Sequence, residues 1–276
     1  MDTILTVLNA ILPALYGAAA VLYGLLLARD LPLARRAGTR LLVATVVLHV
    51  GYVVLGGVWA GRHPIADKFE MFSFAALSMA VSYLWVEWRR KNAYTGVFPL
   101  SLAFLLQACA SLGRGERREL PEILRNPLFA WHSASAAVAV AALSVGAVYG
   151  GLFLVMYRLL KRGDLGPFTE RMPSLDALSA MSLHAVEVGF VALTLAVGSG
   201  DLWVHGSPGL SMADPQVWTT FAVWAVYGAA LLGRYAAHWG GWRIVALNLA
   251  GYAVLFGSLL TVGRVFETFH RFTGRP

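Results

Sequence analysis

The chain has 276 residues, of which 58% are apolar and only 13% are charged, whereas an ordinary globular chain is about 45–50% apolar and about 25% charged. This balance excludes a disordered chain and argues against a water-soluble fold. A single cysteine, Cys109, excludes a secreted fold that is held by disulfide bonds within the chain.

Eight stretches that are nearly free of Asp, Glu, Lys and Arg are long enough to cross a bilayer, which takes about 20 apolar residues. In chain order they are Ile4–Ala28, Leu41–Ala60, Met71–Trp88, Ala93–Gly113, Phe129–Tyr157, Ala177–Val204, Val217–Gly233 and Ile244–Phe266. The connecting segments are short, and no soluble domain is appended to them. We therefore expect an all-α polytopic membrane helix bundle that forms a single domain over residues 1–276.

The net charge of +7 is explained better by membrane topology than by nucleic-acid binding, because the basic residues are distributed unevenly over the connecting loops. The loops after the first, third, fifth and seventh stretches hold 13 basic and five acidic residues, whereas the other side holds nine of each. By the positive-inside rule, we expect both termini outside, in the cell inner (plasma) membrane. Contact with anionic membrane lipid is the expected by-product, and no nucleic-acid partner is predicted.

Two histidines are expected at the outer ends of helices. His132 lies at the start of the fifth stretch, and His270 follows the eighth on the same side. Paired imidazoles at such positions suit a b-type haem (haem b), whose iron accepts two axial nitrogens. Zinc is the alternative metal, but no compact spacing of His, Cys and carboxylate residues supports it.

Two further histidines lie inside predicted spans. His49 follows Arg40 by nine residues, and His184 follows Asp176 by eight, which at 1.5 Å per residue gives depths of about 13 and about 12 Å from the inner side. The two could form one inner haem station if their helices are neighbours, with Glu187 orienting the ring of His184. The alternative is that each is a buried hydrogen-bonding residue that holds helices together.

Several motifs, taken in order over residues 41–272, resemble the cytochrome c assembly protein family, which comprises membrane haem-handling proteins of CcsA and CcmC type and shorter HemX-type relatives. The segment HVGYVVLGGVWAGRHPIADKFEMF, residues 49–72, is similar to the family's second helix and its Pro-x-x-Asn-x-Tyr/Phe-Glu element. Pro64, Phe69 and Glu70 match that element, whereas Asp67 replaces its Asn.

The remaining similarities lie at the outer side. Trp131-His132 is similar to the family's first external haem-ligand histidine, and His270 falls at the second. The segment GFVALTLAVGSGDLW, which ends at Trp203, resembles a Gly-Phe-Pro…Gly-x-x-Trp run with Val in place of Pro. Asp214-Pro215-Gln216 resembles the end of the family's tryptophan-rich signature.

The chain departs from this pattern at two places. The external loop reads HGSPGLSMADP, so that Pro208, Met212 and Ala213 stand where the family has tryptophans. Leu232 replaces a family histidine near the inner end of the next helix, although Arg234 matches. Both departures are expected of a HemX-like branch.

The resemblance implies a membrane protein that handles and transports haem in cytochrome c maturation. His132 and His270 would be axial metal ligands outside, His49 and His184 would form an inner station, and Trp203, Asp214 and Glu70 would also contribute to cofactor binding. The implied partners are haem, a partner membrane protein and apocytochrome c, because this chain does not supply the thiols that receive haem. No catalytic constellation is visible, so enzymatic turnover by the chain itself is not expected.

Two alternatives remain open from the sequence. The first is a HemX-like membrane regulator or scaffold of tetrapyrrole synthesis, which the tryptophan-poor loop favours. The second is a membrane electron-transfer subunit with two b haems, which the two levels of histidines suggest.

Overall fold

The computed structural model describes residues 1–63, 65, 68–112, 126–207 and 211–265. This part of the chain is helical and contains no strand. Its helices are α1 (Asp2–Arg29), α2 (Pro32–Ala60), α3 (Lys68–Arg90), α4 (Val97–Leu112), α5 (Pro127–Lys161), the short α6 (Pro167–Arg171), α7 (Leu175–His205), α8 (Pro215–Tyr235) and α9 (Trp242–Val265). The predicted all-α membrane bundle is confirmed.

Each of the eight predicted spans corresponds to one helix. The boundaries agree to within four residues except at the start of α2, which begins at Pro32, nine residues before the predicted Leu41. Within the described residues, five helices are long and apolar enough to cross a membrane: α1, α2, Phe69–Arg90 of α3, α5 and α7. The apolar runs of α4 and α9, Val97–Leu112 and Trp242–Ser258, are shorter. The chain is therefore a multi-pass membrane protein.

Proline and short polar side chains explain where several helices begin. Proline occupies the first position of α2, α5, α6 and α8, where its missing N–H costs no helical hydrogen bond. Asn126, Ser174 and Asp214 cap α5, α7 and α8 through side-chain oxygens that accept backbone N–H groups. Such caps satisfy donors that the first helical turn leaves without partners.

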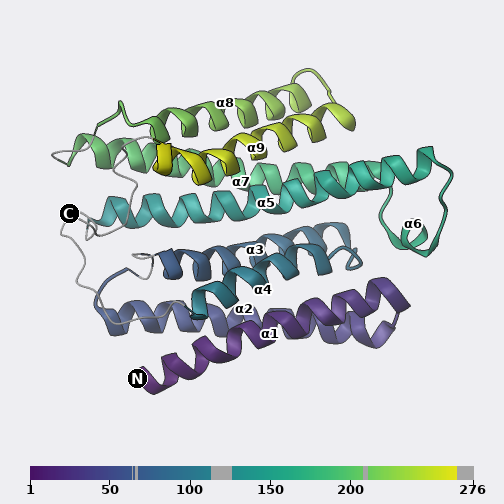
Figure 1. The fold of residues 1–276 in the computed structure, drawn as a ribbon, viewed down its shortest axis with the longest axis horizontal. Coiled ribbons are helices and arrows are strands. Elements are labelled where there is room, and N and C mark those ends of the chain that lie inside the picture. Colours follow the sequence, from purple (N-terminus) through teal and green to yellow (C-terminus); the bar gives the residue numbers. More distant parts are fainter. Residues whose placement is uncertain (64, 66–67, 113–125, 208–210, 266–276) are drawn as a thin grey trace.

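The helices form two groups, with α1–α4 on one side and α5, α7, α8 and α9 on the other (Figure 1). Helix α3 joins the groups by packing against both α5 and α7. The most extensive helix contact in the bundle is between α5 and α7. At this contact a Cβ atom on Gly189 would lie 2.6 Å from Leu143 Cδ2, so the two helices approach as closely as they do because residue 189 lacks a side chain.

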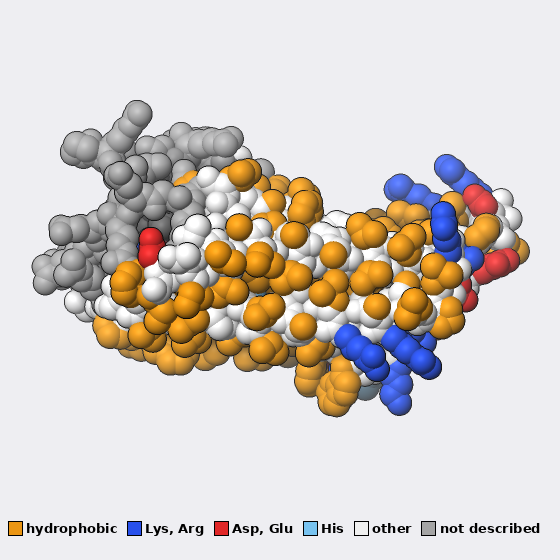
Figure 2. Space-filling view, turned by 90° about the horizontal axis from the view of Figure 1, so that it is seen from below, with side chains coloured by type: hydrophobic (Ala, Val, Ile, Leu, Met, Phe, Trp, Pro, Cys, Tyr) orange, Lys and Arg blue, Asp and Glu red, His pale blue; other side chains and the backbone are white. Residues whose placement is uncertain are grey.

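Helices α5 and α7 project beyond their neighbours at one end of the bundle, where they carry α6 (Figure 1). Their 35 and 31 residues correspond to about 52 and about 46 Å of helix, well beyond the bilayer core of about 30 Å. Lys and Arg side chains gather at this end (Figure 2). The start of α1 and the described end of α9 lie at the opposite end, which we call the outer end in keeping with the predicted topology.

Candidate functional site

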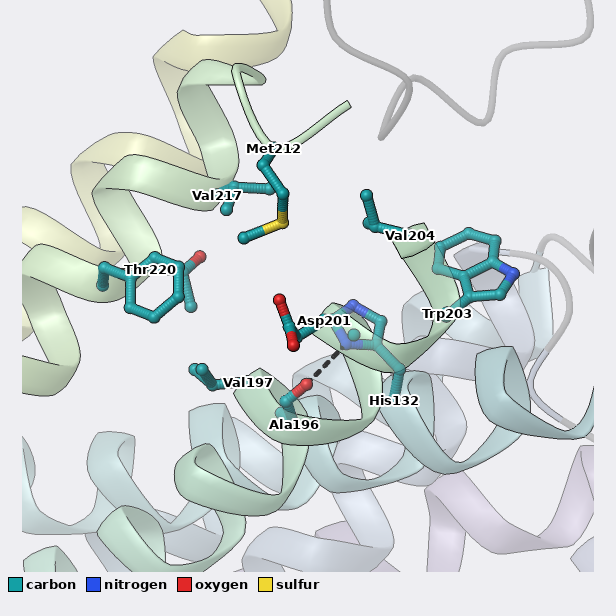
Figure 3. Close-up of a pocket in the computed structure, with 11 residues that line it drawn as sticks. His132, Ala196, Val197, Asp201, Trp203, Val204, Met212, Val217 and Thr220 are labelled. Atoms are coloured by element: carbon teal, nitrogen blue, oxygen red, sulfur yellow. Dashed lines mark hydrogen bonds between the residues drawn. The ribbon is translucent and has the colours of Figure 1, made fainter. Parts of the chain in front are cut away.

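The imidazole of His132 is held at the outer end of α5 by the neighbouring helix. Its Nδ1 lies 2.9 Å from the carbonyl oxygen of Ala196 in α7 (Figure 3). A carbonyl can only accept, so Nδ1 carries a proton, and in the neutral ring the lone pair is on Nε2. A neutral histidine oriented through one nitrogen in this way is the usual form of a metal ligand.

Gly200 of α7 provides the space that this ring occupies. A Cβ atom at position 200 would lie 2.7 Å from His132 Nδ1 and 3.1 Å from Cε1. Side chains do not approach each other this closely, so the ring could not keep its place beside any other residue type. The glycine belongs to the Gly-x-x-Trp segment that ends at Trp203.

A row of aromatic rings extends from His132 toward the end of α2. Trp203, which is only 3% exposed, stacks on His132 with ring centroids 6.1 Å apart and planes at 30°. Phe129 lies 5.1 Å from Trp203, and His63 lies 5.5 Å from Phe129. The sequence analysis predicted Trp203 but gave no role to Phe129 and His63, because no spacing pattern links the segment after α2 with α5 and α7.

A small pocket opens beside His132 (Figure 3). Its lining residues come from α5, α7, α8 and the segment before α8: His132, Ala196, Val197, Gly200, Asp201, Trp203, Val204, Met212, Val217, Thr220 and Phe221. The walls are largely apolar, and the cavity measures about 40 Å³. This volume holds a few water molecules, so a flat ligand the size of a porphyrin needs more space than this conformation provides.

Asp214 and Glu70 have structural partners near the outer end. Asp214 is 6% exposed, and its Oδ1 accepts a hydrogen bond of 2.7 Å from the backbone N–H of Gln216, so that it caps α8. Both carboxylate oxygens of Glu70 accept from the guanidinium of Arg62, at 2.8 and 2.9 Å. This paired hydrogen bond ties the start of α3 to the segment that follows α2.

His49 lies in a buried network of hydrogen bonds among α1–α4. Ser73 Oγ donates to Gln107 Oε1 at 2.9 Å, so it accepts from His49 Nε2 at 2.9 Å. His49 Nδ1 then accepts from the hydroxyl of Tyr16 at 2.9 Å. Both ring nitrogens are thus committed to hydroxyl groups, as expected of a histidine that holds helices together.

His184 lies at the level where α3 and α8 end. Its Nε2 is 2.8 Å from Arg90, the last residue of α3. Its Nδ1 is 3.0 Å from Glu187, which also accepts from the hydroxyl of Tyr235, the last residue of α8. The contact with Glu187 agrees with the predicted orienting role.

The structure does not bring His49 and His184 together. The network of His49 lies among α1–α4, whereas the partners of His184 are on α3, α7 and α8. Helix α3 packs against both α2 and α7, but the described parts of those two helices make no contact with each other. The neighbouring helices that the shared inner station required are therefore not found.

His270, the predicted second external ligand, lies outside the described residues, as do Pro64, Asp67 and Pro208. The pairing of His132 with His270 accordingly stays a prediction. Within the site that the structure describes, His132, Trp203 and Met212 lie at one pocket, whereas Asp214 and Glu70 hold the helices beside it.

Comparisons with known proteins place these features in context. The family described as cytochrome C assembly protein matches residues 65–270. A protein named cytochrome c biogenesis protein CcsA from Synechococcus sp. (strain CC9902) is 28% identical over 243 residues, covering 78% of this chain and 80% of the relative. Proteins of the same name from Synechococcus sp. (strain CC9605) and Guillardia theta are 26% and 22% identical. The first covers 80% of this chain and 82% of the relative, and the second covers 80% of each.

Proposed function

Because the chain belongs to the cytochrome c assembly protein family, we propose that it binds haem at the outer face of the cell inner membrane and hands it on during cytochrome c maturation. The observation that carries this proposal is the setting of His132. Its Nδ1 donates to the Ala196 carbonyl, and its ring stacks on Trp203 at the wall of a pocket. A neutral, oriented imidazole beside aromatic and apolar groups fits the ligand chemistry of haem iron.

In this proposal, His132 and His270 would hold the haem iron through imidazole nitrogens. Trp203 packs against His132 and restricts rotation of its ring. Asp214 and Glu70 act through the helices that they hold, by capping α8 and by fixing the start of α3. The bound haem b supplies the iron and the vinyl groups to which the thiols of an apocytochrome attach. A partner protein presents those thiols.

The absorption spectrum of the detergent-purified protein tests the proposal. We expect a Soret band from substoichiometric haem in the wild type and its loss in His132→Ala, with cytochrome c assembly lost in the same strain. His238→Asn at the inner side is the matched control, because Asn tolerates the positive φ of 53° at this position. Absence of a Soret band from the wild type, or full assembly of cytochrome c by His132→Ala and by His270→Ala, contradicts the proposal.

A second candidate function is a HemX-like regulator or scaffold of tetrapyrrole synthesis. The tryptophan-poor loop and the cavity of only about 40 Å³ favour it. Affinity capture that recovers a haem-synthesis enzyme, together with unchanged cytochrome c after deletion of the gene, would support this function against the first. The two-haem electron-transfer alternative gains no such support, because both nitrogens of His49 and of His184 have hydrogen-bond partners.

A further inference from the structure

An apolar groove runs between α4 and α5 on the surface of the bundle. Its walls are one side of α4, from Val97 to Leu105, and the part of α5 from Val148 to Leu152, and it measures about 460 Å³. Apart from the hydroxyl of Ser101, the lining side chains are apolar. Helices α4 and α5 belong to different groups of helices and touch each other only slightly. The groove therefore lies between the two groups, alongside two apolar helices.

The glycine at position 151 keeps the α5 side of the groove open. A Cβ atom on Gly151 would have no heavy atom within 4 Å. The preceding Gly150 differs, because a Cβ atom there would lie 3.2 Å from Leu249 of α9. Gly150 thus favours the close packing of α5 against α9, whereas a side chain at position 151 would extend into the groove.

The groove begins at the basic end of the bundle. Val97 is the first residue of α4, and α5 continues past the groove toward this end. Arg158 and Arg162 follow Gly151 by seven and eleven residues, which places all three on one face of the helix. The Cα–Cβ bonds of a helix tilt toward its N-terminus, so both arginine side chains leave the backbone in the direction of the groove.

The mouth of the groove carries positive charge that the described protein does not neutralise. Arg158 and Arg162 are exposed, and the ion pairs found among the described residues include neither of them. Residues 158–164 hold three basic side chains and one acidic side chain, that of Asp164. An apolar groove with a cationic mouth matches a molecule that has an apolar chain and an anionic head.

We propose that one anionic phospholipid binds here, with an acyl chain in the groove and its phosphate on Arg158 and Arg162. Guanidinium groups bind phosphate oxygens through paired hydrogen bonds, and the acyl chain covers apolar side chains of both helix groups. A partner's transmembrane helix fits less well. With a diameter of about 10 Å, it would need about 900 Å³ along the same 12 Å or so of α4, which is about twice the volume of the groove.

Native mass spectrometry of the detergent-purified full chain, stripped of lipid and titrated with dioleoyl phosphatidylglycerol, tests the proposal. We expect the wild type to bind one such lipid more tightly than dioleoyl phosphatidylcholine. Gly151→Leu fills the groove and should weaken the binding of both lipids roughly tenfold. Arg158→Gln combined with Arg162→Gln should weaken phosphatidylglycerol roughly fivefold for each arginine, or about 25-fold for the pair, and thereby remove the preference for it.

Two variants of α2 are matched controls. A Cβ atom on Gly51 also has no heavy atom within 4 Å, so Gly51→Leu adds the same side chain on another helix. Arg36 and Arg40 are exposed and lie four residues apart on α2, so Arg36→Gln combined with Arg40→Gln removes the same charge. Neither control should change the affinity for either lipid.

The proposal is overturned if Gly151→Leu binds phosphatidylglycerol as tightly as the wild type does, or if the Arg158 and Arg162 double variant keeps the lipid preference. Equal losses of affinity in the controls overturn it as well, because the lipid would then respond to charge and apolar surface anywhere on the chain. A dimer that Gly151→Leu dissociates, with no lipid retained by the wild type, would assign the groove to a helix instead. Circular dichroism checks the fold of each variant, and the arginine pair decides the question if Gly151→Leu does not fold.

Discussion

Gly200 decides whether His132 can occupy its place against α7. A methyl group at this position would meet the ring at 2.7 Å from Nδ1, so the imidazole must turn away from the Ala196 carbonyl. Gly198, two residues earlier on the same helix, has nothing within 4 Å of the corresponding point. Both glycines lie within α7, but only a side chain at position 200 would collide with His132.

We expect Gly200→Ala to abolish or strongly reduce haem binding, because His132 loses the hydrogen bond that sets its tautomer and orientation. Gly198→Ala should keep the haem and stabilise α7 slightly, by up to about 1 kcal/mol, since alanine favours a helix interior over glycine. Soret absorbance per protein and thermal unfolding in detergent measure the two effects. Equal haem content in both variants would contradict the role given to Gly200.

At the level of single residues, the order of the motifs singled out His132 and Trp203, and the structure brings their rings into contact. The sequence analysis gave no role to His63 and Phe129, which join the same rings from the segment after α2 and from the start of α5. It placed His184 about 12 Å deep by counting from Asp176, although the ring meets the last residue of α3. The depth was counted from Asp176 in the first turn of α7. Because α7 begins well beyond the ends of the neighbouring helices, His184 lies where those helices end.

The hydrogen-bond network around His49 links the four N-terminal helices to one another. Tyr16, His49, Ser73 and Gln107 belong to α1, α2, α3 and α4 respectively, and each of them is buried without exposure to lipid or with very little. Replacing the imidazole removes two hydrogen bonds and takes away the acceptor of the buried Tyr16 hydroxyl, whereas the Ser73 hydroxyl keeps its hydrogen bond to Gln107. In this position the histidine contributes to the packing of four helices.

We accordingly expect His49→Leu to lower the free energy of unfolding by about 1–2 kcal/mol while leaving the haem spectrum unchanged. Val47→Ala is the control on the same helix, because Val47 is 66% exposed and lies on the lipid-facing side. Thermal unfolding followed by circular dichroism gives the stability. A loss of haem absorbance in His49→Leu without a loss of stability would restore His49 as a candidate ligand.

For the whole molecule, the runs without charged residues predicted every long helix, because a bilayer admits only helices of apolar composition over this length. The same runs could not predict which helices pack together or how far α5 and α7 project. Those features depend on close contacts such as Gly189 against Leu143 and on where the neighbouring helices end. For the same reason the runs could not predict that the described parts of α2 and α7 make no contact.

The orientation of the bundle can be checked by labelling introduced cysteines in a Cys109→Ser background. Ser207 follows α7 at the outer end, and Asp164 lies between α5 and α6 at the projecting end. We expect a membrane-impermeant maleimide to label Ser207→Cys in intact cells and Asp164→Cys only after permeabilisation, because the positive-inside rule predicts that the basic end faces the cytoplasm. The cysteine-free protein gives the background, and the reverse labelling pattern would invert the topology.

The extensive packing of α5 against α7 divides the walls of the pocket into two parts. His132, Ala196, Gly200 and Trp203 all lie on this tightly joined pair, so their mutual geometry is preserved when the pair tilts as a rigid body. The remaining wall comes from α8 and the turn before it, which contact α7 less extensively. If a ligand of porphyrin size binds here, we expect α8 to move outward to make room for it, and a crosslink between α7 and α8 at this end to prevent binding without disturbing the imidazole.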